Sequence, residues 1–289
     1  MKSAAVDVLR GNARMMKKAD VICLVLAVLV GAAVMLPIWW IFRSSLMTNA
    51  ELYAFPPNFV PRDWIWANYA RTLEVFKFWK YFGNTMLIIV PSVSAGTFTA
   101  VLCGYAFGRL KFKAKKFWFS LCIGSMLLPT TVTLIPLYIM WVRFFGLGGT
   151  YWPLILPYFC GGGAFNIFLI RQFIRTIPRE LDEAATIDGA GYMRILFQII
   201  IPAIKPAMIV VALFIFVTLW NDLLQQSVYI TREENFTIAI GLTQFRSGLA
   251  ADWAKIMCAT CLSFLPGIII YLFGQRYFVE GIVLTGMKN

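Results

Sequence analysis

Long stretches without a charged residue constrain this chain more than any other feature. The first three cover residues 21–42, 81–108 and 117–142 and contain 22, 28 and 26 residues. A hydrophobic helix of about 20 residues crosses the hydrocarbon core of a bilayer, and only helices and closed barrels satisfy their backbone hydrogen bonds there. The chain is also 60% hydrophobic and 14% charged, which is unlike a soluble domain. We therefore predict an all-α polytopic membrane protein.

Three further stretches complete a set of six predicted transmembrane helices, and they cover residues 144–170, 206–221 and 256–275. The span at 21–42 is longer than the apolar core of a signal peptide, so we interpret it as an uncleaved first helix. Pro129 and Pro136 remove backbone hydrogen bonds and predict a break or kink in the third span. The glycines at 161–163 weaken the fourth helix and permit close packing.

The basic residues predict the orientation of these spans. The net charge is +12, and 17 of the 26 lysines and arginines fall within residues 1–20, 109–116, 171–205 and 276–289. Basic loops remain on the cytoplasmic side of a membrane, so both termini are predicted to be cytoplasmic. The cations lie at the edges of apolar stretches and form no continuous stripe, which disfavours a nucleic-acid-binding protein.

This pattern divides the chain into a cytoplasmic N-terminal tail at 1–20 and a transmembrane domain at 21–289. The polar segments at about 43–80 and 222–255 are predicted to be extracytoplasmic loops. The polar segment at 177–202 is predicted to be cytoplasmic.

The sequence contains little that catalysis or metal binding requires. It has no histidine, the commonest acid–base group. Its six cysteines lie in apolar stretches, and Cys258 and Cys261 have the spacing of a metal motif without further ligands, so we interpret them as packing residues. Residues 281–286 imitate a phosphate-binding loop, but the lysine is displaced and no Ser or Thr follows it. We predict a non-catalytic chain without a cofactor or metal of its own.

The segment at 177–202 is predicted to form a helix, a turn and a second helix. The first helix follows Pro178 and has acidic residues near its N-terminus, where the helix dipole favours them. Gly189 permits the turn, and a helix from Tyr192 is predicted to end at Pro202. Small side chains would let a partner approach closely. The predicted contacts with a partner are Glu180, Asp182, Glu183, Ala184, Ala185, Asp188 and Gly189.

The spacing of this segment resembles a known signature. Glu183 opens a Glu-Ala-Ala triplet, Gly189 follows the triplet after three residues, and Ile199 and Pro202 follow after nine more. This order resembles the signature loop of permease subunits of binding-protein-dependent ABC importers, although Ile201 replaces the usual leucine. The resemblance implies a coupling helix that sits in a cleft of an ATP-hydrolysing subunit. An ordinary amphipathic connector between two spans is the alternative.

Other passages are similar to the smaller permease subunit of maltose-type carbohydrate importers, a type I ABC importer. They are Phe55-Pro56-Pro57, Asn68-Tyr69, Gly104-Tyr105-Ala106-Phe107, Arg109-Leu110, Ile167-Phe168-Leu169, Trp220-Asn221-Asp222, Asp252-Trp253 and Gln275-Arg276-Tyr277-Phe278-Val279-Glu280-Gly281. The resemblance implies a permease subunit in a bacterial inner membrane that forms half of an alternating-access path for an oligosaccharide or related sugar. It also implies a second homologous permease, an extracytoplasmic solute-binding protein, and a dimeric ATP-binding subunit that holds ATP and Mg²⁺. The ending Met287-Lys288-Asn289 departs from the family pattern.

The resemblance further implies that residues 243–253 form an extracytoplasmic loop that reaches toward the binding protein. Its predicted contact residues are Phe245, Arg246, Ser247 and Gly248. Aromatic and arginine side chains often anchor protein interfaces. A solvated turn with an interfacial Trp253 is the alternative.

Two questions stay open at the level of sequence. A secondary transporter or channel is the competing function, but it requires charged groups within the membrane, and only Asp222 lies at the edge of a span. The solute is also undecided between a neutral maltodextrin-like sugar, an acidic uronate oligosaccharide such as an alginate fragment, and glycerol phosphate. A general likeness slightly favours the acidic oligosaccharide, although no particular residue supports that choice.

Overall fold

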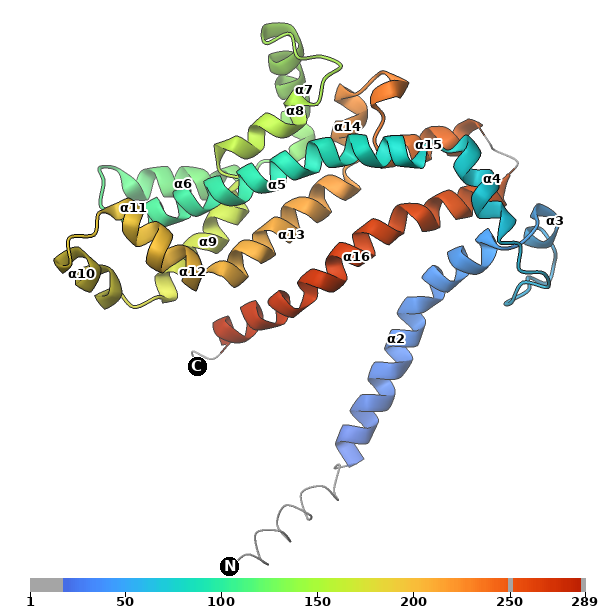
Figure 1. The fold of residues 1–289 in the computed structure, drawn as a ribbon, viewed down its shortest axis with the longest axis horizontal. Coiled ribbons are helices and arrows are strands. Elements are labelled where there is room, and N and C mark those ends of the chain that lie inside the picture. Colours follow the sequence, from blue (N-terminus) through green and yellow to red (C-terminus); the bar gives the residue numbers. More distant parts are fainter. Residues whose placement is uncertain (1–17, 249–251, 287–289) are drawn as a thin grey trace, which may run out of the picture. The chain divides into compact units, whose positions relative to one another are not determined.

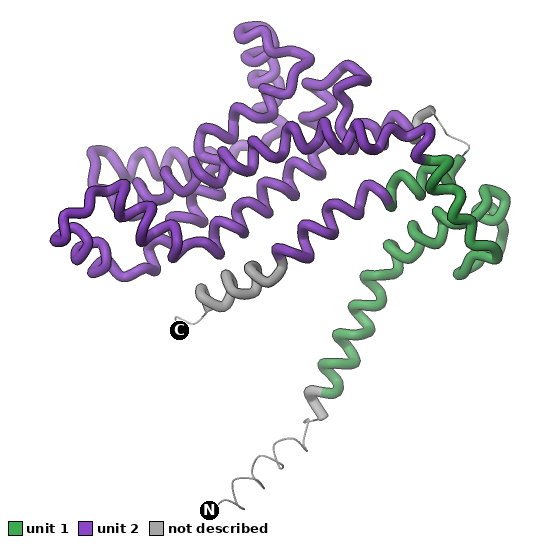
Figure 2. Tube along the Cα trace, in the orientation of Figure 1, with its two compact units in different colours: residues 1–72, 251–261 green, residues 73–250, 262–289 purple. Residues whose placement is uncertain are grey.

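The computed structural model of the protein describes residues 18–248 and 252–286, and all regular structure within them is helical (Figure 1). Most of the predicted N-terminal tail lies outside this part of the chain, as do residues 249–251 and 287–289. The described residues belong to two compact units (Figure 2). Unit 1 comprises residues within 1–72 and 251–261, and unit 2 comprises residues within 73–250 and 262–289.

Within the described part of the chain, four helical stretches are long and apolar enough to cross a bilayer, and they are Val21–Ser45, Phe78–Gly108, Trp152–Thr176 and Trp253–Gly274. The number rises to the predicted six if each of two bent pairs forms one span. The pair Lys115–Ser125 and Thr130–Phe144 is bent by 100°, and the pair Tyr192–Ala203 and Lys205–Asn221 by 79°. The first bend ends at Pro129, which agrees with the break predicted from that proline.

Unit 1 contains α2 (Lys18–Ser45), α3 (Asn49–Leu52), most of α4 (Ala67–Val75) and the first turns of α16 (Trp253–Gly286). Polar groups join these pieces. Asn68 donates from Nδ2 to the carbonyls of Ser45 and Met47, both at 3.0 Å. The Nδ2 atom of Asn49 lies 3.2 Å from Oδ1 of Asp252. The segment between α2 and α4, which was predicted to be an extracytoplasmic loop, is therefore an ordered, hydrogen-bonded structure.

Unit 2 contains the remaining elements. The longer helices are α5 (Phe78–Gly108), α6 (Lys115–Ser125), α7 (Thr130–Ile139), α9 (Ala164–Thr176), α10 (Glu180–Ile187), α13 (Lys205–Asn221) and α15 (Ile238–Gly248). The shorter helices are α8 (Trp152–Ile155), α11 (Tyr192–Ile195), α12 (Ile201–Ala203) and α14 (Leu224–Tyr229). Two π-helical turns, Met140–Phe144 and Leu196–Ile200, extend α7 and α11, and 3₁₀ turns cover Leu156–Cys160 and Glu233–Asn235.

The core of unit 2 lies where α5, α9 and α13 pack together, side by side in Figure 1. Ile88, Ile170 and Val211 are fully buried there. A Cβ atom added at Gly104 would lie 2.6 Å from Cγ2 of Ile170, and one at Gly108 would lie 3.0 Å from Cγ2 of Ile174. The two glycines, four residues apart, therefore let α9 approach α5 closely.

The helix that begins at Tyr192 ends at Ala203, one residue past Pro202 and close to the predicted end. The π-helical turn Leu196–Ile200 precedes the proline, and α12 carries the chain through it to Ala203. Local π-helical geometry accommodates the missing N–H of a proline in membrane helices. The chain bends only afterwards, before α13 begins at Lys205.

Candidate functional site

The predicted coupling segment contains the expected helix and turn. Helix α10 has Glu180, Asp182 and Glu183 in its first turn. Gly189 has a φ of +79°, which is a left-handed conformation that glycine adopts without strain. The amide of Gly189 donates to the carbonyl of Thr186 at 3.0 Å, and the amide of Ala190 donates to the carbonyl of Ala185 at 2.9 Å. The turn between α10 and α11 is therefore closed by backbone hydrogen bonds.

One face of this segment is exposed and carries several large apolar side chains. Its α10 part lies outside the candidate spans, whereas Tyr192 and Met193 begin the bent pair Tyr192–Ala203 and Lys205–Asn221. Ile187 is 87% exposed, Tyr192 71% and Met193 65%. Soluble surfaces rarely gather large apolar side chains without a partner. We call this face the docking surface, and its members are Glu180, Leu181, Glu183, Ala184, Ile187, Asp188, Tyr192 and Met193.

Two of the predicted contact residues, Asp182 and Ala185, instead face the rest of unit 2. Ala185 is half-buried and packs against the hydrophobic core. Asp182 forms an ion pair with Arg109, whose Nε atom lies 2.9 Å from Oδ2 of Asp182. Burial raises the pKa of Asp182, and the attraction of Arg109 and Arg179 offsets this only in part. The adjacent alanines therefore differ, because Ala184 is exposed and Ala185 is not.

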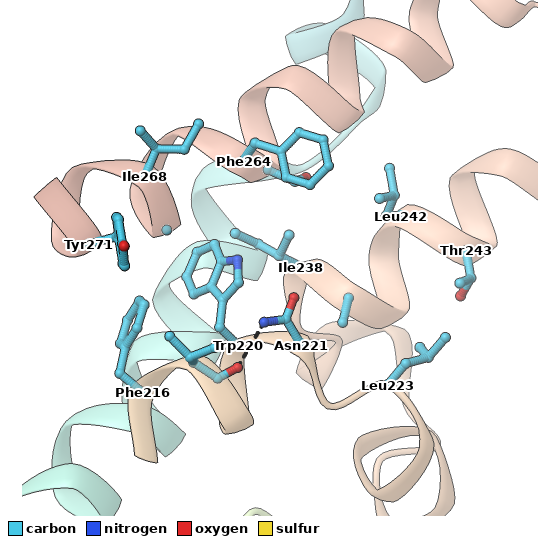
Figure 3. Close-up of a pocket in the computed structure, with 14 residues that line it drawn as sticks. Phe216, Trp220, Asn221, Leu223, Ile238, Leu242, Thr243, Phe264, Ile268 and Tyr271 are labelled. Atoms are coloured by element: carbon cyan, nitrogen blue, oxygen red, sulfur yellow. Dashed lines mark hydrogen bonds between the residues drawn. The ribbon is translucent and has the colours of Figure 1, made fainter. Parts of the chain in front are cut away.

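A groove of about 460 Å³ lies between the C-terminal end of α13, helix α15 and the part of α16 within unit 2 (Figure 3). Trp220 lies at its centre and stacks on Phe216, with ring centroids 5.5 Å apart. A Cβ atom added at Gly267 would lie 3.5 Å from Nε1 of Trp220, so α16 passes close to the indole. Asn221 is held next to Trp220 by a 2.9 Å hydrogen bond from its Nδ2 to the carbonyl of Val217.

The groove combines aromatic faces with a few neutral polar groups. Phe216, Trp220, Phe264 and Tyr271 supply the aromatic rings. The polar side chains in the described lining are Asn221, Thr243, Ser263 and the hydroxyl of Tyr271, and none of these described lining residues is charged. Small-molecule sites typically have such a mainly apolar lining with few polar groups that fix orientation. A sugar ring, which has apolar C–H faces and a rim of hydroxyl groups, matches this chemistry.

The four predicted binding-protein contacts all fall within α15. Helix α15 continues to Gly248, where a loop was expected from residue 243 onward. Phe245 is 9% exposed and its ring centroid lies 5.2 Å from that of Phe76, so it packs within unit 2. Arg246, Ser247 and Gly248 belong to the helical backbone of α15. Leu249 to Ala251, at the expected tip, lie outside the described residues.

Sequence reasoning gave no role to Arg109 or to the groove residues Trp220 and Asn221, although all three occur in the passages that carry the family resemblance. The signal for Arg109 was a cation directly after a long apolar helix. That position is equally typical of a topology determinant. No local sequence pattern indicates the groove, because its walls come from three separate helices, α13, α15 and α16.

Three comparisons with known proteins agree on the family. Residues 96–282 match the model of the "Binding-protein-dependent transport system inner membrane component" family. The chain is 31% identical over 257 residues to the probable ABC transporter permease protein YurM of Bacillus subtilis, covering 89% of this chain and 85% of YurM. It is 30% identical over 279 residues to the maltodextrin transport system permease protein MdxG of Bacillus subtilis, covering 96% and 99%.

The fold is also similar to a solved structure. A chain in the crystal structure of a bacterial ABC transporter involved in the import of the acidic polysaccharide alginate matches with a TM-score of 0.78 and 25% sequence identity. The match covers 91% of this chain and 99% of that chain. Taken with the coupling segment and the helical spans, these matches show that the protein belongs to the inner membrane permease subunits of binding-protein-dependent sugar ABC importers.

Proposed function

We propose that this chain forms half of the membrane path of an ATP-driven oligosaccharide importer and is driven through the docking surface by a separate ATP-binding dimer. The observation that carries the proposal is the exposed face of α10, which lies outside the candidate spans and next to a glycine turn. Close seating of a partner against Ala184 would couple nucleotide-driven closure to movement of the spans. ATP and Mg²⁺ would be bound by that partner, and this chain would be non-catalytic.

The remaining partners follow from the family. A homologous permease would complete the path, and an extracytoplasmic binding protein would deliver the sugar. Both termini would be cytoplasmic in a bacterial inner membrane, as the distribution of cations predicts. Of the predicted contacts with the binding protein, Arg246, Ser247 and Gly248 remain candidates.

We infer that the sugar is a neutral oligosaccharide and that it contacts the groove during passage. Among the residues whose side chains are described, the lining of the groove has no lysine or arginine to pair with a uronate carboxylate or a phosphate. Its aromatic rings and neutral amide and hydroxyl groups suit a neutral sugar. This reverses the slight preference for an acidic oligosaccharide that general likeness suggested.

A secondary transporter with its own coupling ion receives no support from the described residues. Among them, no three His, Cys, Asp or Glu side chains come together as a cation site. Asp222 accepts a 3.0 Å hydrogen bond from the backbone amide of Gln225 through Oδ1, which suits a structural role at the start of α14.

Replacing Trp220 with alanine tests the groove. The complete importer, reconstituted in lipid vesicles, is first offered a panel of neutral and acidic oligosaccharides, and a neutral one should stimulate ATP hydrolysis most. For that sugar, Trp220→Ala should raise the concentration for half-maximal uptake about two- to tenfold, since an aromatic contact contributes about 0.5–1.5 kcal/mol. Trp220→Phe should retain most of the affinity.

Trp118→Ala is the matched control, because Trp118 is 51% exposed and lies outside the groove. It should leave the half-maximal concentration unchanged. If Trp220→Ala and Trp118→Ala behave alike, the groove is not a sugar contact. If only acidic oligosaccharides stimulate hydrolysis, the inferred sugar class is wrong.

A further inference from the structure

The last turn of α5 holds the coupling segment on both sides of α10. Arg109, directly after α5, donates from Nη2 to the carbonyl of Ile177 at 2.7 Å, just before α10. Its Nε atom pairs with Asp182 within α10 at 2.9 Å. Tyr105 donates from its hydroxyl to the carbonyl of Tyr192 at 3.2 Å, at the start of α11. The residue that precedes α10 by a few positions, α10 itself and the start of α11 are thus all bonded to the same end of α5.

The ion pair at this point is partly buried. The side chain of Arg109 is 5% exposed and that of Asp182 is 18% exposed. Within the described residues, the other carboxylate oxygen of Asp182, Oδ1, is buried and accepts no hydrogen bond. Ion pairs of this kind contribute little net stability, because desolvation opposes their attraction, and their best-attested use is to fix the register of two elements. The geometry therefore favours a positioning role over a stabilising one.

The other end of α5 is bonded to the wall of the groove. Asn84 donates from Nδ2 to the carbonyls of Glu234 and Phe236, both at 2.9 Å. The amide of Ile238, the first residue of α15 and part of the groove lining, donates to Oγ1 of Thr85 at 3.0 Å. Helix α5 is continuous over its 31 residues, about 45 Å, although Pro91 lies within it. One helix therefore connects the coupling segment with the groove.

We propose that Arg109 is the positioning residue that fastens the coupling helix α10 to α5, and that α5 transmits the displacement of α10 to the α15 wall of the groove. This inference rests on the proposed roles of the docking surface and the groove. It adds a specific mechanical connection between them. Loosening the connection should let ATP hydrolysis proceed with less sugar movement.

The experiment measures sugar molecules transported per ATP hydrolysed in the complete importer in lipid vesicles. The probe is the radiolabelled oligosaccharide from the panel that best stimulates wild-type hydrolysis. Arg109→Gln and Asp182→Asn should each lower this ratio by about two- to thirtyfold, the range seen for residues within coupling networks. Arg109→Lys keeps the charge but loses the forked pair of donors, so its ratio should be intermediate. Arg175→Gln, at an exposed arginine near the end of α9, should keep the wild-type ratio.

A purely structural ion pair predicts a different result, namely fewer assembled importers with an unchanged ratio, and this would overturn the inference. If the Arg109→Gln importer does not assemble, the ratio of sugar transported to ATP hydrolysed is measured for the nearly isosteric Asp182→Asn variant instead. Ala184→Trp in parallel tests the docking surface. If it blocks transport while both ion-pair variants keep the wild-type ratio, the docking proposal stands and the inference fails. If Ala184→Trp transports normally, the docking proposal itself fails.

Discussion

Ala184 and Ala185 have identical side chains and adjacent positions but different surroundings. Ala184 belongs to the exposed docking surface, whereas Ala185 packs inward against the core of unit 2. A helix turns by about 100° per residue, so neighbouring positions face different directions. A substitution at Ala185 should therefore report mainly on packing, and a substitution at Ala184 should report on the proposed partner.

Ala184→Trp should abolish binding-protein-stimulated ATP hydrolysis while the complex still assembles, because the indole would prevent close seating of the ATP-binding subunit. Ala185→Trp should instead reduce the amount of folded protein, since overpacking a core costs about 1–3 kcal/mol. Ala184→Ser, which stays small, is the control. Normal stimulation in Ala184→Trp at wild-type assembly would mean that α10 is only a connector.

At the scale of elements, the break before α9 has a clear structural cause. All three glycines at 161–163 have positive φ angles, and they separate the 3₁₀ turn Leu156–Cys160 from α9. Gly162 lies against the backbone of Gly96 in α5, so close that a side chain at 162 would collide with it. Thr99 completes the junction by donating to the carbonyl of Tyr158 at 2.9 Å. The break is therefore held in place by α5.

Gly162→Ala and Gly146→Ala distinguish two reasons why a position requires glycine, namely a left-handed backbone and close packing against a neighbour. Both residues have a φ of +66°, but a Cβ atom added at Gly146 would have nothing within 4 Å, whereas one at Gly162 would meet Gly96. Each alanine should cost about 1–2 kcal/mol for its left-handed backbone. Gly162→Ala should cost about 1–3 kcal/mol more for overpacking. Thermal unfolding of the purified protein in detergent measures both, and equal losses would contradict the close contact with α5.

Much of the helical architecture could be predicted from the sequence because the signals are local. The apolar stretches, the break at Pro129 and the turn at Gly189 each depend on a few adjacent residues. The inward orientation of Ala185 and the helical conformation of residues 243–248 could not be predicted. These depend on neighbours distant in sequence, such as Phe76 against Phe245. The groove and the Arg109–Asp182 pair also depend on residues that are distant in sequence, so they could not be predicted either.

At the scale of the whole molecule, the family and the fold are established, whereas the orientation in the membrane stays a prediction from the cations. The central claim is that this chain moves a sugar using energy released in another subunit. A chain that worked alone would need its own nucleotide site or coupling ion. We instead propose that this chain has a docking surface and a groove connected by α5.

The most direct test is sugar uptake and ATP hydrolysis in vesicles that contain either this chain alone or the complete importer. We predict that the chain alone hydrolyses no ATP and accumulates no sugar, even with a sodium or proton gradient. The complete importer should accumulate sugar only with ATP and the loaded binding protein, and omitting this chain should abolish uptake. Gradient-driven accumulation by the chain alone, or ATP hydrolysis by it, would contradict the account.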